Sequence, residues 1–169
     1  RLDVGLVRDE GGRLDVTVLE TSIRDVEAEV PEARGLPRPD LVFPNYGDHA
    51  YTKVAIDPDS LAFLKENMER IEDPLLRLQL WASLWNMTRD QQLKSTEYLQ
   101  LVRDKIAGEA MPELVEAVLG NATTAISRYV PEDWRQREAH ELARLAYTVL
   151  KATKSPDLRI IWARTLIGV

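Results

Sequence analysis

Apolar and polar residues alternate with a period of two at the start of the chain. Leu2, Val4 and Leu6 follow this pattern, and residues 14–18 resume it after the turn sequence Asp9-Glu10-Gly11-Gly12. Alternation on both sides of a glycine-containing turn is typical of two antiparallel strands. The pattern therefore predicts a β-hairpin with one buried face, formed by Leu2, Val4, Leu6, Leu14, Val16 and Val18.

Three further short strands are predicted before residue 57. Residues 26–30 alternate as far as Pro31, and residues 41–43 and 51–56 follow a connector rich in glycine and proline. About five strands with no helix between them indicate an antiparallel sheet. Five strands are few for a closed sandwich. We therefore expect residues 1–57 to be an incomplete portion of a β-sandwich.

The hydrophobic period changes to about 3.6 residues at Asp57-Pro58, where Asp57 is placed to cap a helix that has Pro58 at its first position. Asp73-Pro74, Pro131 and Ser155-Pro156 provide similar starts further along. Short connections between helices favour antiparallel neighbours. Six helices are predicted, beginning near residues 58, 74, 95, 112, 131 and 156.

The chain is thus predicted to be α+β in two parts, an antiparallel β-sandwich portion at 1–57 and an all-α, solenoid-like antiparallel helical domain at 58–169. The second helix is apolar in nearly every direction, so we expect other elements to cover it on several sides. The sixth helix is still apolar at its end. We expect Ile161, Leu166 and Ile167 to form an uncovered face, the helical domain to be incomplete, and self-association to occur there.

Charge and composition exclude several classes of function. The net charge is −6, and all of it lies in residues 1–60, whereas a nucleic-acid-binding protein is expected to carry a basic stripe. No apolar run approaches the roughly 20 residues that span a bilayer. The chain has no cysteine, which excludes a disulfide framework and a thiolate metal site and fits a reducing cytoplasm. Neither nucleic acid nor a membrane is expected as a partner.

The sequence contains no complete motif of a zinc-dependent peptidase. A zinc-binding His-Glu-x-x-His helix needs two histidines one turn apart, but after His140-Glu141 the second histidine position holds Arg144. A guanidinium stays protonated and repels Zn²⁺. We therefore interpret His140 and Glu141 as solvated residues on one helix face.

The other candidate constellations have simpler structural explanations. A triad could be written from Ser60, His49 and Asp57, but no nucleophile elbow is present, and Ser60 is placed to cap a helix. Trp81 and Trp85 lie one helical turn apart and are interpreted as packing rather than a ligand platform. The glycines form no phosphate-binding loop. We predict no catalytic, cofactor-binding or metal-binding residue in this chain.

Several segments resemble bacterial aminopeptidase N, especially the actinobacterial type. They are Leu41–Asn45, Ala50–Val54, Asp73–Arg77 and Leu84–Asp90, together with Asp57 and Ser60-Leu61. The resemblance is clearest over residues 38–107, and only a general helical pattern remains beyond Glu109. Residues 46–50 and Asn86 depart from the family pattern, where relatives often have an acidic stretch with Leu-Thr and an aspartate. These departures indicate a divergent member.

The resemblance implies a fragment that joins the end of the β-sandwich domain to the start of the C-terminal helical domain. The parent enzyme would be a zinc metallopeptidase, a hydrolase that removes amino-terminal residues from peptides. The family's zinc helix and its Gly-x-Met-Glu-Asn loop have no counterpart here. The fragment's partners would be the catalytic domain of the same polypeptide and the parent's peptide substrates. It would pack on that domain and shape peptide access.

A second interpretation stays open: a free-standing helical module that binds peptides or proteins. Recovery of a specific peptide partner would favour the module, whereas the incomplete sheet and the uncovered sixth helix favour the fragment. An enzyme complete in itself is a third reading. It would require hydrolysis of an amino-terminal aminoacyl amide by this chain, and we expect none.

Overall fold

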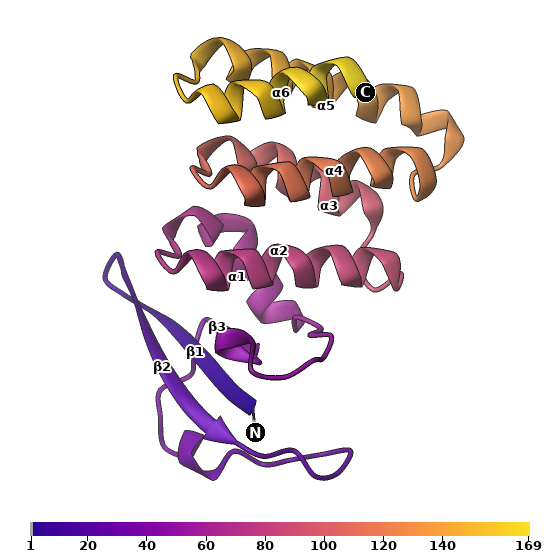
Figure 1. Cartoon of the computed structure of the whole chain (residues 1–169). Helices are drawn as coiled ribbons and strands as arrows, with labels where there is room; N and C mark the ends of the chain where they lie inside the picture. The colour runs from indigo at the N-terminus through magenta and orange to yellow at the C-terminus, as the bar shows by residue number, and fades with distance from the viewer. Residues whose placement is uncertain (1) are drawn as a thin grey trace. The chain divides into compact units, whose positions relative to one another are not determined.

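The computed structural model describes residues 2–169, which form a three-stranded antiparallel sheet followed by six α-helices (Figure 1). An α+β chain is therefore confirmed. The chain divides into two compact units, the first ending at Asn86 and the second running from Met87 to Val169. The domain boundary predicted between residues 57 and 58 is a different one, because it marks the change from strands to helices. It stays a prediction.

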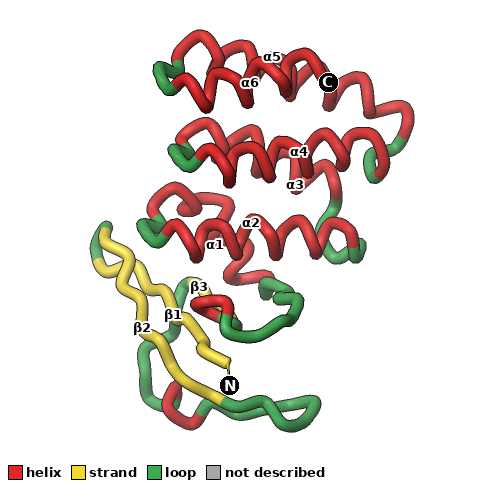
Figure 2. Tube along the Cα trace, viewed as in Figure 1, coloured by secondary structure: helices red, strands yellow, loops and turns green. Residues whose placement is uncertain are grey.

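The sheet has the strand order β2-β1-β3. β1 (Leu2–Glu10) and β2 (Arg13–Thr21) form the predicted hairpin, and β3 (Leu41–Pro44) pairs with the other edge of β1 (Figure 2). Gly11 and Gly12 form the turn with φ angles of 67° and 105°, which lie in the region that favours glycine. The turn chemistry thus places the hairpin where the sequence predicts it.

The prediction of a single buried hairpin face is wrong because of the register. Val7 lies opposite Val16, whereas Leu6 lies opposite Thr17. Even-numbered residues of β1 therefore share a face with odd-numbered residues of β2. The predicted face, with even-numbered residues in both strands, cannot form, because a shift of one position in the pairing moves every side chain of a strand to the other face. Val7 shares its face with Leu41 and Phe43, and all three are at most 1% exposed.

Two of the five predicted strands are absent from the described residues. Residues 26–30 form no strand, and Val26 is 97% exposed. Residues 51–56 also pair with no strand, although Val54 and Ile56 are buried. In this second segment the period-two pattern reflects burial of alternate side chains along an extended chain. It does not require a hydrogen-bonded ladder.

All six predicted helices are confirmed. Asp57 caps the first one, accepting hydrogen bonds from the backbone N–H groups of Asp59 and Ser60. Asp73 accepts one from Leu75 N at 2.9 Å at the start of the second helix, and Ser155 caps the sixth. The helices are α1 (Pro58–Asn67), α2 (Pro74–Arg89), α3 (Ser95–Lys105), α4 (Pro112–Arg128), α5 (Glu132–Ala152) and α6 (Pro156–Gly168).

Helix α2 is covered less completely than its composition predicts. Leu76, Leu80 and Leu84 are fully buried. Leu75 and Leu78, however, are 42% and 39% exposed, and they lie three residues apart on one helical stripe. The apolar residues of α2 therefore form one buried face and one partly exposed face.

In the second unit, α3 and α4 form one helical pair and α5 and α6 another, and the two pairs stack with α3 against α5 and α4 against α6 (Figure 1). Each helix contributes a face of buried aliphatic residues, as the 3.6-residue period predicts. An ion pair between Arg103 of α3 and Glu138 of α5 joins the two pairs. The Glu138 side chain is only 4% exposed.

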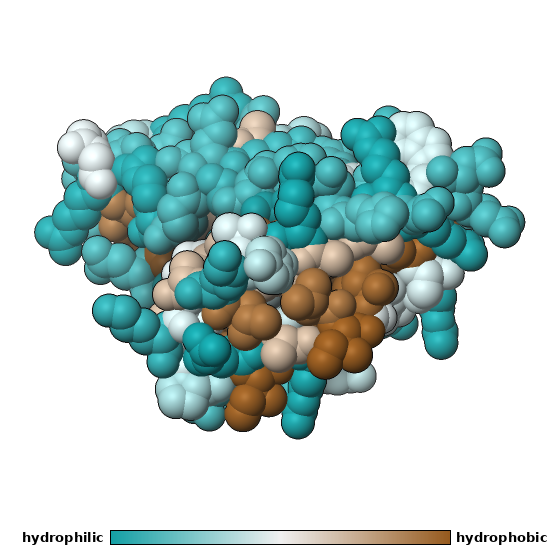
Figure 3. Space-filling model, turned by 90° about the horizontal axis from the view of Figure 1, so that it is seen from above, coloured by the Kyte–Doolittle hydropathy of each residue, from teal (hydrophilic) through white to brown (hydrophobic). Residues whose placement is uncertain are grey.

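The face of the α5–α6 pair follows the prediction in part. Ile167 is 85% exposed and Leu166 is half-buried, whereas Ile161 is 8% exposed and is buried with Trp162, so the prediction of an uncovered Ile161 is wrong. Ile160, which the prediction did not include, is 52% exposed. Figure 3 shows hydrophobic side chains gathered on part of the face seen from above, beside a mainly hydrophilic area. Within residues 2–169 no helix has both the length and the apolar character needed to cross a membrane.

Candidate functional site

His140 lies exposed in the middle of α5, as predicted for a solvated helix-face residue. Its neighbour Glu141 forms an ion pair with Arg144 at 2.6 Å. Arg144, at the position where a zinc site would need a histidine, is thus a cation that pairs with the Glu141 carboxylate. Among residues 2–169, no three His, Cys, Asp or Glu side chains gather in a group that could hold a metal ion.

The structure does not assemble the Ser60, His49 and Asp57 triad. His49 Nε2 lies 3.2 Å from Asp3 Oδ2, on the sheet side of the unit. Ser60 donates its hydroxyl hydrogen to Asp57, and the same oxygen accepts a hydrogen bond from Val42 N at 2.9 Å. The helix cap is Asp57, and buried Ser60 connects that cap to strand β3.

The two tryptophans of α2 differ in environment. Trp81 is 3% exposed, which agrees with its interpretation as a packing residue. Trp85, one turn later, is half-buried. The interpretation of Trp85 as a packing residue stays a prediction.

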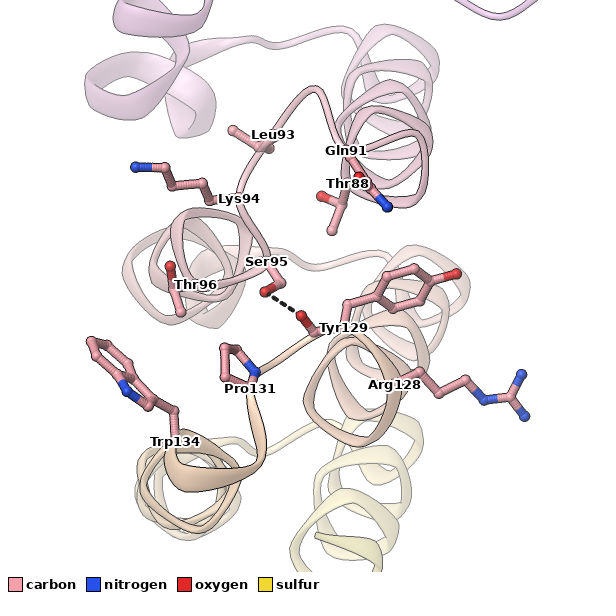
Figure 4. A pocket seen from close by; sticks show the side chains of 10 residues that line it. All are labelled: Thr88, Gln91, Leu93, Lys94, Ser95, Thr96, Arg128, Tyr129, Pro131 and Trp134. Carbon is pink, nitrogen blue, oxygen red and sulfur yellow. Dashed lines mark hydrogen bonds between the residues drawn. The ribbon is translucent and has the colours of Figure 1, made fainter.

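A cleft of about 540 Å³ lies within the second unit, where the turn before α3 approaches the turn before α5 (Figure 4). The first turn and the start of α3 contribute Leu93, Lys94, Ser95 and Thr96. The second turn and the helix ends beside it contribute Arg128, Tyr129, Pro131 and Trp134. Ser95 Oγ donates a hydrogen bond to Tyr129 O at 3.0 Å, and this bond joins the two turns at the centre of the cleft.

The side chains around this hydrogen bond divide into two groups. In Figure 4, Lys94, Thr96 and Trp134 lie on one side of it, and Gln91, Tyr129 and Arg128 lie on the other. Each side thus carries one cation and one aromatic ring. Trp134 is 49% exposed and Tyr129 is 38% exposed, so both rings are accessible to a ligand.

The cleft is electropositive although the chain is acidic. Its lining contains Lys94 and Arg128 but no Asp or Glu. In the described part of the chain neither cation forms a salt bridge, and both residues are exposed. The guanidinium of Arg137 lies 5.6 Å from the Trp134 ring centroid, over one ring face. Arg137 and the acidic residues Glu97, Glu132 and Asp133 lie near the cleft but do not line it.

Two helix N-termini and two helix C-termini meet at the cleft, so their dipoles oppose one another. The N-termini of α3 and α5 both reach it, and neither has a side-chain hydrogen bond at its N-cap. The C-terminal carbonyls that arrive there are satisfied: Gln92 N and Leu93 N donate to Met87 O, and Tyr129 N donates to Ala125 O. Since α3 begins at Ser95 with Lys94 at the N-cap, the serine hydroxyl is used to join the turns rather than to cap.

No direct signal for this cleft is present in the sequence. Its residues come from two turns more than 30 positions apart, and each turn alone looks like an ordinary helix connection. The one local signal was the lysine at a helix start, a place where Ser, Thr, Asp or Asn is usual. Trp134 is apolar like the buried residues of its helix, but it is 49% exposed.

Comparison with known proteins gives a family match over most of the chain. Residues 41–168 match the model of the ERAP1-like C-terminal domain. This range includes all six helices. It extends well past residue 107, the end of the segment in which the resemblance to aminopeptidase N is clearest in the sequence. An aminopeptidase N of Streptomyces lividans is 32% identical to the chain over 144 residues.

The match covers 83% of this chain but only 17% of that aminopeptidase N, so most of the relative has no counterpart here. The prediction of a fragment from the C-terminal region of such a protein agrees with both comparisons. The chain belongs to the ERAP1-like C-terminal domain family, in the group that includes bacterial aminopeptidase N.

Proposed function

We propose that this chain is a non-catalytic C-terminal region of a zinc-dependent aminopeptidase, which packs on the catalytic domain and shapes the access of peptides. The observation that carries the proposal is the family match over residues 41–168. The environments of His140, Ser60 and His49 support a non-catalytic role, since each side chain is exposed or is bonded to groups that stabilise the fold. Zinc would be bound by residues of the parent enzyme outside this chain.

The architecture proposed for the intact parent follows from the two units. The three-stranded sheet would form part of a β-sandwich, and the stacked helical pairs would continue as a solenoid. An extended β2 edge supports the first point, because Val16 and Val18 on it are 37% and 43% exposed. The exposed α6 face supports the second. The cytoplasmic location predicted from the lack of cysteine stays a prediction.

The non-catalytic role is tested with the isolated chain. It should not hydrolyse leucine p-nitroanilide, an aminoacyl amide, either alone or with added Zn²⁺. Activity that copurifies with the chain, and that is lost on chelation, would show that the chain is an enzyme in itself.

The role in access is tested with the Streptomyces relative. A form of that aminopeptidase N lacking the matched segment is assayed alone and with this chain added, on leucine p-nitroanilide and on a long peptide. The chain should bind the truncated enzyme and change hydrolysis of the long peptide more than that of the small amide. Absence of binding, or equal effects on both substrates, would contradict the proposal.

The second candidate function, a free-standing helical module that binds peptides, has one observation in its favour. The electropositive cleft lies entirely within residues 88–134 of the second unit, so it does not need a catalytic domain to be formed.

A further inference from the structure

We propose that the cleft between the turns before α3 and α5 is a binding site for an extended acidic peptide segment. The segment would place an acidic side chain on each side of the Ser95–Tyr129 hydrogen bond and apolar side chains against Trp134 and Tyr129. This proposal concerns the isolated chain and does not depend on its role in a parent enzyme.

The charge of the ligand follows from the lining. Lys94 and Arg128 have no salt-bridge partner within the described residues, and no acidic side chain lines the cleft. The acidic residues of the adjoining first turns, Glu97, Glu132 and Asp133, lie outside the lining. A ligand that carries carboxylates would therefore meet complementary charge on both sides.

The extended shape of the ligand follows from the placement of the two cations. They project on opposite sides of the hydrogen bond that joins the two turns (Figure 4). A peptide in extended conformation carries side chains at intervals and can reach both.

The apolar component follows from the two aromatic rings. Arg137 lies over one face of the Trp134 ring, at 5.6 Å from its centroid, and Trp134 is still 49% exposed, so part of it is accessible for apolar contact. Partly exposed aromatic side chains beside cations are typical of residues that contribute most at protein interfaces. Gln91, Ser95 and Thr96 add polar groups that can bond to a peptide backbone.

The cleft is held in place before any ligand binds. Gln91 has a left-handed φ of 61°, which ends α2 and directs the chain into the turn before α3. The Ser95–Tyr129 hydrogen bond then fixes that turn against the one before α5. Arg135 Nε donates to Val130 O at 3.0 Å and supports the second turn. A preformed site lowers the entropy cost of binding.

The test uses the full chain and a short peptide in which Glu alternates with Phe, acetylated and amidated so that its ends are uncharged. A matched peptide has Gln in place of Glu. We expect the Glu peptide to bind more tightly than the Gln peptide and to bind less tightly as salt is raised. Lys94→Met and Arg128→Met should each weaken binding of the Glu peptide about two- to fivefold and leave the Gln peptide unchanged.

Two variants serve as references. Trp134→Ala should weaken both peptides, because it removes apolar contact and not charge. Lys154→Met, which removes an exposed lysine outside the cleft, should change neither affinity. Thermal unfolding of each variant verifies that it is folded. The proposal is overturned if the Glu peptide does not bind, if the two peptides bind equally, or if Lys94→Met and Arg128→Met bind like the unchanged chain.

Discussion

Arg103 of α3 forms an ion pair with Glu138 of α5, and the two side chains are 17% and 4% exposed. Arg103 also donates a hydrogen bond to Gln100 at 2.9 Å. Replacing Glu138 by Gln leaves a largely buried guanidinium without its counter-charge. We expect Glu138→Gln to lower the free energy of unfolding by about 3 kcal/mol, measured by urea denaturation.

The neighbouring pair on the same helix is the matched control. Glu141 and Arg144 are 36% and 77% exposed, so Glu141→Gln should lower the free energy of unfolding by less than about 1 kcal/mol. The double replacement Arg103→Met and Glu138→Met should be close to neutral, because an apolar pair avoids the desolvation of two charges. A Glu138→Gln cost no larger than that of Glu141→Gln would show that the buried pair contributes little.

Gly5 of β1 lies against the ring of Tyr46. A Cβ atom at position 5 would be 2.8 Å from Tyr46 Cδ2. The ring cannot move away freely, because its hydroxyl donates a hydrogen bond to Asp73 Oδ2 at 2.8 Å. We therefore expect Gly5→Ala to destabilise the chain by about 1–3 kcal/mol in thermal or urea unfolding.

Two comparisons isolate the cause of that effect. In a Tyr46→Ala background the ring is absent, so Gly5→Ala should cost much less, and the difference measures the coupling of the two residues. Gly120→Ala in α4 meets no atom within 4 Å and should stabilise its helix by roughly 0.5–1 kcal/mol. Equal costs of Gly5→Ala with and without the Tyr46 ring would contradict a steric cause.

The helices could be predicted from the sequence because their signals are local. Asp57, Asp73 and Ser155 each begin a helix through bonds to residues two or three positions away. The hairpin could be located for the same reason, since Gly11 and Gly12 need φ angles that few other residues adopt. Signals of this kind do not depend on which distant segment packs on the element.

The sheet register and the cleft could not be predicted because they depend on distant pairings. The pairing of Val7 with Val16 rather than Thr17 decides which face is buried, yet both choices fit an alternating pattern. Val54 and Ile56 alternate like strand residues but are buried without a partner strand. The cleft needs Ser95 and Tyr129 in contact across 34 positions.

Asp57 links stability to acidic pH. Burial acts to raise its pKa, but hydrogen bonds from the Ser60 hydroxyl and from Ser60 N and Asp59 N prevail and hold the pKa below the usual value. The folded form therefore binds this proton less readily than the unfolded form. Its contribution to stability should be present above about pH 4 and lost as the pH falls further through the folded pKa.

The variant Asp57→Asn tests this contribution. Asn still accepts a capping hydrogen bond but does not titrate. Asp57→Asn should therefore lower the free energy of unfolding by about 1 kcal/mol at neutral pH, and this difference should become smaller below about pH 4. Urea unfolding over a series of pH values measures this difference. Ser155→Ala, which removes the cap of α6, is the control, because the serine hydroxyl does not titrate in this range and the effect of the substitution on the free energy of unfolding should not change with pH. A constant cost at all pH values would exclude the proposed titration.

Tyr46 links stability to alkaline pH. Burial and the hydrogen bond to the Asp73 carboxylate raise its pKa above the usual value of about 10. The folded form therefore keeps the phenolic proton longer than the unfolded form, and this contribution should decline as the pH rises above about 10. Tyr46→Phe should cost about 1 kcal/mol at neutral pH and less at alkaline pH, as measured by thermal unfolding. A cost that does not change with pH would contradict this.

Ile160 and Ile167 lie seven positions apart on α6, on one helical stripe, and they are 52% and 85% exposed. Burial of such side chains between two copies removes apolar surface from water. We propose that the chain self-associates through this face, and sedimentation equilibrium should show a concentration-dependent mass.

Ile167→Glu should shift the chain toward monomer, because association would then bury a carboxylate. Val26→Glu, at a position 97% exposed in the first unit, is the matched control and should leave the association unchanged. A monomer at all concentrations, or an equal effect of both substitutions, would contradict association through α6.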